Sequence, residues 1–170
     1  MSLFDKFDIV NHIIGKYKSD YEEDISPIKL QKSLYLLFAF WVEKVTGDKL
    51  TLDNMQNNYF SDVNFGNCDV ELFEPQFEAW HYGPVDPEIY QMYKYGGKSA
   101  DKQLYAKLLD DQEKLSIINF LNSKLDQIFA TNDFTLVDIT HEDQCWQLAY
   151  NNSNSHQMKG EDIINEHTVR

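Results

Sequence analysis

Five histidines and one His-Glu-Asp run are the residues of this chain most suited to acid–base or metal chemistry. None of the histidines lies in an HExxH or another paired ligand spacing; they are His12, His81, His141, His156 and His167. The run His141-Glu142-Asp143 places a proton carrier beside two carboxylates, so an acid–base or cation-binding role is conceivable. We favour a structural role, in which the acidic side chains cap the helix containing Trp146 and the histidine bonds a carbonyl. The sequence therefore predicts no catalytic residue and no metal site.

The two cysteines, Cys68 and Cys145, show no pattern typical of nucleophilic or redox chemistry. They form no CxxC, two thiols do not make a disulfide framework, and neither has the basic neighbour of a reactive thiolate. The sequence also lacks a nucleophile elbow, a Walker loop and a GxGxxG turn. We expect a protein that is not an enzyme, needs no cofactor and works in a reducing cytoplasm.

The segment FEAWHYGPVDPEIY, residues 77–90, organises the rest of the chain. Gly83 permits a positive φ and Pro84 fixes the next φ, so the pair predicts a fixed corner. Asp86-Pro87 is then typical of an N-cap followed by the first residue of a helix. Loops held by a rigid scaffold are the usual place for recognition. We therefore expect His81, Tyr82 and Asp86 to face a partner.

Apolar residues at helical spacing dominate the chain and predict a mainly α fold. We expect residues 1–170 to form a single compact helical domain around a central buried helix, from about residue 27 to residue 46, which Gly47 ends. Partial alternation around Pro75 predicts at most a small β element near residues 72–80. Residues 151–170 are interpreted as a loosely attached C-terminal segment. The tryptophans are expected to be core anchors, although aromatic residues also line ligand pockets.

The formal net charge of −13 limits the partners that this chain can bind. Proteins bind a nucleic-acid backbone through clusters of Lys and Arg, so we expect no direct nucleic-acid binding. The longest apolar run, Leu34–Val42, is too short to span a bilayer, so we expect no membrane association. The same charge favours solubility and the attraction of a basic partner.

Three segments resemble the motifs of the Panacea domain family, bacterial and phage proteins also described as SocA-like or GepA-like. In the family's order they are SPIKLQKSLYLLFAFW (26–41), AWHYGPVDPEIY (79–90) and DITHEDQCWQLAY (138–150). Ser33 departs from a common Leu, and Gln144-Cys145 departs from the commoner Gly-Pro before Trp146. Residues 50–70 make the distance between the first two motifs longer than the family pattern leads us to expect, and they are interpreted as a family-variable insertion. The resemblance assigns structural or binding roles to Lys29, Leu30, Lys32, Tyr35, Ala79, Trp80, Gly83, Pro84, Val85, Tyr90, Thr140 and Trp146.

The resemblance implies an antitoxin that neutralises a cognate protein toxin, encoded by an adjacent gene, through direct binding. Partner binding is expected at His81, Tyr82, Asp86, Glu88, His141, Glu142 and Asp143. A homo-oligomer is possible. Two other functions stay open. One is a phage or prophage-encoded inhibitor of a host protein, whose acidic surface mimics nucleic acid. The other is an adaptor that delivers a bound protein to a protease.

Overall fold

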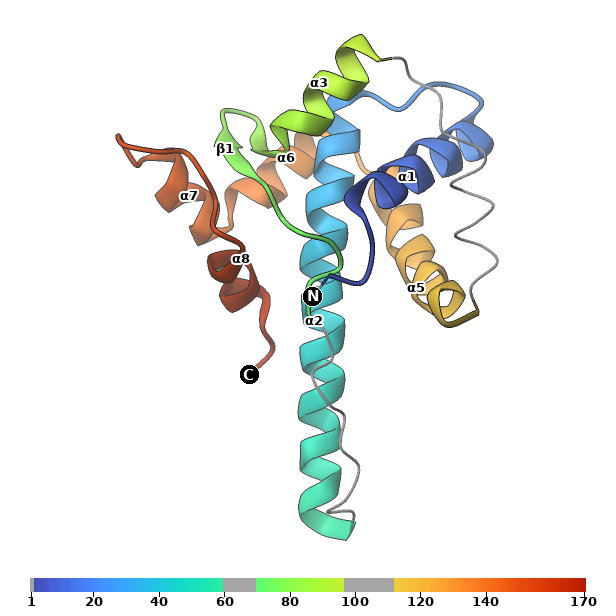
Figure 1. Ribbon diagram of the computed structural model, residues 1–170, viewed down its shortest axis with the longest axis vertical. Coiled ribbons are helices and arrows are strands. Elements are labelled where there is room, and N and C mark those ends of the chain that lie inside the picture. The colour runs from blue at the N-terminus through green and yellow to red at the C-terminus, as the bar shows by residue number, and fades with distance from the viewer. Residues whose placement is uncertain (1, 60–69, 97–111) are drawn as a thin grey trace.

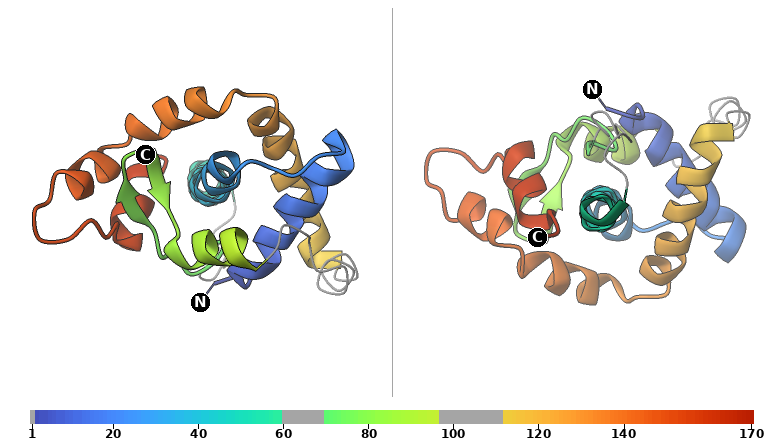
Figure 2. Two further views of the ribbon diagram at one scale, coloured as in Figure 1. Left: turned by 90° about the horizontal axis from the view of Figure 1, so that it is seen from above. Right: turned by 90° about the horizontal axis from the view of Figure 1, so that it is seen from below.

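One long helix runs through the centre of the computed structural model, which describes residues 2–59, 70–96 and 112–170 (Figure 1). Seen along this helix, α2 (Pro27–Tyr59), the other described elements form a ring around it (Figure 2). The ring contains α1 (Lys6–Tyr21), the strands β1 (Glu78–Trp80) and β2 (Gly83–Val85), α3 (Pro87–Tyr95), α5 (Gln112–Phe129), α6 (Asp133–His141), α7 (Gln144–Tyr150) and α8 (Gly160–His167). The predicted mainly α fold with a small β element is confirmed.

Helix α2 begins where the sequence predicts. The Ser26 hydroxyl oxygen accepts a hydrogen bond from the Lys29 backbone N–H at 3.0 Å, and Pro27 occupies the first helical position. The middle of the helix is buried on all sides, which is why it forms the axis of the fold. Its fully buried apolar side chains are Leu34, Tyr35, Leu37, Phe38 and Val42.

The predicted end of α2 near Thr46 is wrong, because the helix continues through Gly47 for three more turns. One side-chain interaction spans the glycine and another bonds its carbonyl. Lys44 and Asp48 form an ion pair at 2.7 Å, and the Thr51 hydroxyl donates to the Gly47 carbonyl oxygen at 3.0 Å. An interior glycine costs a helix only about 1 kcal/mol relative to alanine, so local pairing of this kind is enough to carry the helix past it.

Aromatic rings fill the core between α2 and the segment that leads into β1. Tyr35 and Phe38 of α2 meet Phe73 and Phe77 edge-on, with ring centroids 5.3 to 6.4 Å apart. Edge-to-face contacts at this distance stabilise aromatic pairs beyond their buried area. Helices α1 and α5 also pack on α2. Their buried apolar residues are Ile9, Val10, Ile13, Ile118, Leu121 and Leu125.

The small β element is a hairpin with two residues at its tip. Strands β1 and β2 pair in antiparallel orientation with Ala79 opposite Pro84, and His81–Tyr82 connects them. Gly83 has the predicted positive φ, at 101°, but it opens β2 instead of forming the tip. The expected corner therefore exists and lies two residues closer to the N-terminus than the Gly-Pro pair.

The C-terminal segment is firmly attached, so its interpretation as a loose end is wrong. The Ala79 N–H donates to the His156 carbonyl at 2.7 Å, and the Met158 N–H donates to the Phe77 carbonyl at 2.8 Å. These bonds hold the segment against β1. Met158 and Ile163 are also buried in the core. A third stretch of backbone thus bonds to the hairpin region. The helix of the same segment, α8, packs on α2.

Several sequence-based interpretations lie outside the described residues. These are Cys68 and residues 60–69 of the predicted insertion. Within the described ranges, none of the helices has both the length and the apolar character needed to cross a membrane.

Candidate functional site

A buried lysine lies beneath the Gly-Pro pair. Lys32 is 1 % exposed, and its ammonium nitrogen donates to the Pro84 carbonyl oxygen at 2.8 Å. A Cβ atom on Gly83 would lie 2.5 Å from the Thr140 hydroxyl oxygen and 2.8 Å from Lys32 Cε. Burial lowers the pKa of Lys32 to about 7, and among the described residues it has no ion-pair partner. Glycine is therefore required here both by its φ and by the close approach of α2 and α6.

Asp86 is not available to a partner, contrary to the sequence-based expectation. It is 1 % exposed, forms an ion pair with Lys6 at 2.8 Å and caps α3 by accepting the Ile89 N–H at 3.1 Å. The Gln31 side chain also bonds the Asp86 backbone on both sides, at 2.9 and 3.2 Å. Glu88, 60 % exposed, binds Lys6 at 3.0 Å and is the carboxylate of this group that faces solvent. The predicted N-cap role of Asp86 is confirmed, and in this role the side chain is buried.

The hairpin tip, by contrast, exposes aromatic side chains. Tyr82 is 51 % exposed and meets Phe134 of α6, itself 58 % exposed, edge-on at a centroid distance of 6.0 Å. His81 is exposed as well, and its Nδ1 lies 3.1 Å from the Tyr150 hydroxyl. Of the residues predicted to meet a partner, His81 and Tyr82 lie on the surface at the hairpin tip, and Glu88 and Glu142 are exposed elsewhere. Phe134 was missed because its exposure depends on how α6 packs.

The connection between α6 and α7 is hydrogen-bonded to the hairpin. His141 Nε2 donates to the His81 carbonyl oxygen at 2.9 Å, so the expected histidine–carbonyl bond is present. The same imidazole stacks on Trp146, with ring centroids 4.0 Å apart, and Trp146 donates to the Trp80 carbonyl at 3.1 Å. Two loops that are 60 residues apart in the sequence thus form one rigid surface, and His141 is only half-buried at its edge.

Asp143 supports the fold instead of lying free on the surface. Its carboxylate accepts from the Tyr35 hydroxyl at 2.5 Å and from His167 Nε2 at 2.8 Å, and its side chain is 17 % exposed. Burial lowers the pKa of His167, but the hydrogen bonds and charges of Asp143 and Glu43 outweigh burial and raise it to about 9. Asp143 occupies the N-cap position of α7 without making the cap bond. The neighbouring Glu142 is exposed.

The expectation that the acidic run Glu142-Asp143 caps α7 is wrong, because Asp143 makes no cap bond and Glu166 of α8 makes it instead. The two carboxylate oxygens of Glu166 accept from the backbone N–H groups of Gln144 at 2.7 Å and Cys145 at 2.6 Å. A proline at position 145, as in the commoner family sequence, would remove one of these donors. No local pattern indicates this contact, because Glu166 lies more than 20 residues away on α8.

Donor atoms of Asp143, Cys145 and Glu166 lie within 4.8 Å of one another. Thiolate and carboxylate are ligands that zinc takes. Here both carboxylates accept two hydrogen bonds each, and burial, together with the neighbouring carboxylates, raises the pKa of the Cys145 thiol to about 12. A thiol with that pKa is protonated at neutral pH and is a poor nucleophile. The contacts of the three side chains are those of a structural joint between α7, α8 and α2.

Most of the motif residues are architectural by their burial. Fully or almost fully buried are Leu30, Lys32, Tyr35, Ala79, Val85, Thr140 and Trp146, along with the backbone of Gly83 and Pro84. Trp80 and Tyr90 are half-buried and meet edge-on at 5.2 Å. Lys29 is buried too and donates to the Phe129 carbonyl at 2.9 Å. Two side chains of the first motif bond directly to the other motifs, Lys32 to Pro84 and Tyr35 to Asp143.

Helices in a ring around α2, with a fixed aromatic hairpin, define a protein without a recognisable catalytic constellation in its described part. A comparison with protein families matches residues 58–147, just over half of the chain, to the family described as antitoxin SocA-like, Panacea domain. The chain belongs to this family. The matched range contains the hairpin motif and most of the third motif, and it begins after the first motif in α2. No curated protein and no solved structure gave a significant match.

Proposed function

We propose that this protein is an antitoxin that neutralises a cognate protein toxin by direct binding, without catalysis, and that the toxin is encoded by an adjacent gene. Membership of the SocA-like family supports the antitoxin role. We further propose that the toxin binds at the tip surface, which we define as His81, Tyr82, Phe134, Asp138, His141 and Glu142.

The exposed Tyr82–Phe134 pair is the observation that carries this assignment. Both residues are more than half exposed to solvent. Large aromatic side chains that are held in place dominate binding energy at protein interfaces, because little conformational entropy is lost when they are covered. The bonds from His141 and Trp146 to the backbone of the hairpin supply that rigidity.

The charges around this pair favour a basic partner. Asp138 and Glu142 are exposed on α6 and at its end, and Asp138 lies one helical turn from Phe134 on the same face. The chain as a whole carries a formal charge of −13. An aromatic centre with an acidic rim matches the usual division of interface energetics, in which charge steers the encounter and buried rings hold the complex.

Co-expression with each flanking gene tests the proposal. We expect one flanking product to arrest growth when expressed alone, and the wild-type chain to restore growth and to co-purify with it. The double variant Tyr82→Ser with Phe134→Ser should lose both effects while keeping its circular dichroism spectrum. Tyr95→Ser is the matched control, because Tyr95 is a more exposed ring, at 73 %, on α3.

Two outcomes would contradict the proposal. If both flanking products are harmless, the protein is not the antitoxin of a neighbouring toxin. If the double variant rescues growth as well as the Tyr95→Ser control does, the toxin binds elsewhere on the molecule.

A further inference from the structure

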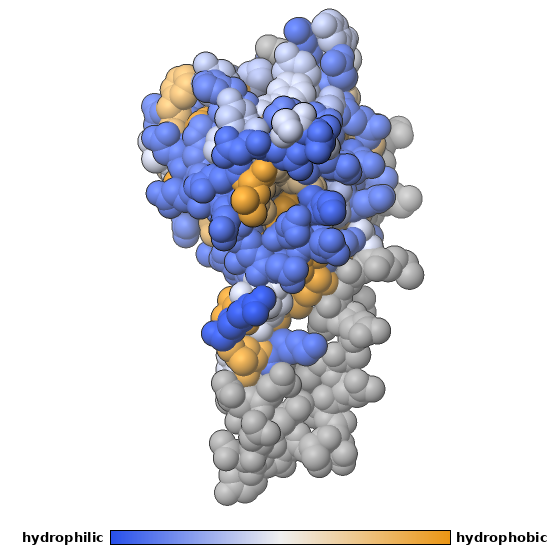
Figure 3. All heavy atoms as spheres, turned by 90° about the vertical axis from the view of Figure 1, so that its left-hand side faces the viewer, coloured by the Kyte–Doolittle hydropathy of each residue, from blue (hydrophilic) through white to orange (hydrophobic). Residues whose placement is uncertain are grey.

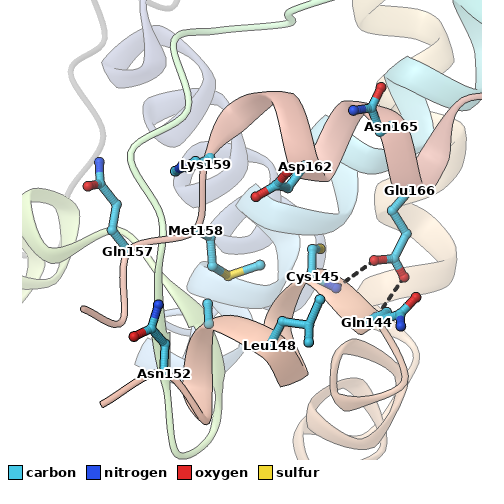
Figure 4. Close-up of a pocket in the computed structure, with 11 residues that line it drawn as sticks. Gln144, Cys145, Leu148, Asn152, Gln157, Met158, Lys159, Asp162, Asn165 and Glu166 are labelled. Carbon is cyan, nitrogen blue, oxygen red and sulfur yellow. Dashed lines mark hydrogen bonds between the residues drawn. The ribbon is translucent and has the colours of Figure 1, made fainter. Parts of the chain in front are cut away.

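A groove of about 610 Å³ lies between α7 and α8, on a different part of the molecule from the tip surface. Its base is apolar and is formed by the buried residues Cys145, Ala149 and Met158. Leu148 and Met158 point into the space between the two helices (Figure 4). The face of the molecule on which α7 and α8 lie carries an apolar patch framed by hydrophilic side chains (Figure 3). The groove therefore combines concavity with an apolar base.

Leu148 is the unusual residue of this groove. It is 67 % exposed although it lies in the middle of a short, well-anchored helix. A single exposed leucine on a convex surface is common in soluble proteins. This one lines a concave site beside a buried methionine, and apolar surface arranged in that way is typical of a site that receives an apolar side chain.

The polar rim of the groove consists of four amide side chains and three charged ones, and its net charge is negative. Asp162 and Glu166 contribute two negative charges and Lys159 one positive charge. Glu166 is occupied by the backbone N–H groups of α7. Asp162 is exposed, and within the described part of the chain its carboxylate has no hydrogen-bond or ion-pair partner. A ligand with a positive charge next to an apolar group would complement this arrangement, and the formal charge of −13 would attract it.

We propose that the α7–α8 groove binds a cationic amphipathic segment of a protein partner. An apolar side chain of the segment rests on Leu148 and Met158, and a Lys or Arg side chain pairs with Asp162. This is the helix-in-groove or extended-segment mode of peptide recognition. The inference deepens the proposed function, on which it rests for the identity of the partner, because a toxin with such a segment would hold the antitoxin at two places.

The methionine methyl groups provide a local probe for binding. We would titrate a helical peptide made only of Leu and Lys, with its leucines on one face, into protein labelled with ¹³C at the methionine methyl groups. The Met158 resonance, assigned with Met158→Leu, should shift on binding. The resonance of Met92, a partly buried residue of α3, should not. A peptide in which Ser replaces every Leu, and one in which Glu replaces every Lys, should leave both resonances in place.

Variants of the groove then measure its contribution. Leu148→Ser should weaken peptide binding about tenfold, which is the usual effect of removing one central apolar contact. Leu50→Ser, at a leucine 37 % exposed on α2, is the apolar control and should have no effect. Asp162→Asn should weaken binding about two- to fivefold at low salt. Glu161→Gln, at the neighbouring exposed position outside the groove, should not.

The results separate this inference from the antitoxin proposal. An unshifted Met158 resonance, equal binding of the Glu-containing peptide, or an affinity unchanged by Leu148→Ser would each overturn the groove assignment. If Phe134→Ser abolishes peptide binding and Leu148→Ser does not, the cationic segment binds at the tip surface and the groove assignment is wrong. If the peptide binds the groove but no flanking gene product is neutralised, the groove assignment stands and the antitoxin proposal fails.

Discussion

At the scale of single residues, Gly83 is constrained both by its backbone conformation and by its close neighbours. Its φ of 101° is unfavourable for any residue with a Cβ, and an added Cβ would lie 2.5 Å from the Thr140 hydroxyl. Gly83→Val should therefore lower the free energy of unfolding by about 1–3 kcal/mol for backbone strain alone, with a further loss from the clash. Urea denaturation measures the change.

Gly47 provides the matched control for that experiment. It lies inside α2 with ordinary helical geometry, and a Cβ there would meet only Val169 Cγ2 at 3.7 Å. Gly47→Ala should raise the free energy of unfolding by about 0.5–1 kcal/mol, because alanine is the better helix former. An unchanged midpoint for Gly83→Val would contradict the geometry described for the hairpin.

Lys32 and His167 predict opposite pH dependences of stability. The pKa of Lys32 falls from 10.5 to about 7 on folding, so the unfolded chain binds more protons between these values and stability rises with pH there. The pKa of His167 rises from 6.5 to about 9, so its stabilisation is complete below pH 6.5 and is lost as pH rises through about 9. Each effect has a limiting slope of about 1.4 kcal/mol per pH unit.

Between pH 7 and pH 9 the two effects largely cancel in the wild type, and single variants separate them. Lys32→Met should make stability fall with rising pH in this range, and His167→Gln should make it rise. Chemical denaturation at several pH values measures both slopes. Parallel slopes for the two variants would show that at least one of these groups titrates normally in the folded protein.

At the scale of elements, α7 depends on a cap supplied by α8. The Glu166 carboxylate binds the first two N–H groups of α7, where both hydrogen bonding and the helix dipole favour an anion. Glu166→Gln should lower the free energy of unfolding by about 0.5–2 kcal/mol, the usual range for a lost N-terminal cap. Glu161→Gln, an exposed carboxylate in the first turn of α8, should change it much less. Equal losses would mean that the cap contributes nothing beyond general charge.

The elements that could be predicted from the sequence are those determined by neighbours in the chain. Ser26 and Asp86-Pro87 indicate helix starts, because each capping oxygen lies within three residues of the N–H group from which it accepts a hydrogen bond. The end of α2 could not be placed at Gly47 by the same logic, since a glycine only weakens a helix. The attachment of residues 156–158 to β1 was hidden because it depends on backbone pairing with a distant strand.

The candidate site was predictable to the same extent. The position of His81 and Tyr82 at a corner follows from local turn chemistry, and both lie on the surface. The burial of Asp86 does not follow, because its partner Lys6 is 80 residues away in the sequence. Asp143 was assigned to a partner for the same reason, although Tyr35 and His167 hold it from two other helices. Carboxylates are the residues for which one sequence is least informative, since the same side chain serves a solvent face or a buried pair.

At the scale of the whole molecule, the charge of −13 should control how fast a basic partner associates. Of the four carboxylates that the sequence offers for this role, Asp86 and Asp143 belong to the fold, so neutralising them would test stability instead of steering. The exposed pair Asp138 and Glu142 on the tip surface is the appropriate choice. Replacing both by the corresponding amides should slow association with the toxin several-fold at low ionic strength and should leave dissociation nearly unchanged.

The control removes the same charge from another part of the surface. Glu74 and Glu161 are exposed and lie outside the tip surface, so Glu74→Gln with Glu161→Gln reports the effect of net charge alone. The difference between the two double variants should shrink as salt is raised, because the screening length falls to about 8 Å at physiological ionic strength.

Tyr82→Ser should instead accelerate dissociation at every salt concentration, since a buried ring acts after the encounter. Stopped-flow mixing with the toxin measures both rates. Equal association rates for the two double variants at low salt would mean that the molecule attracts its partner by its overall charge and that Asp138 and Glu142 have no special place in the encounter.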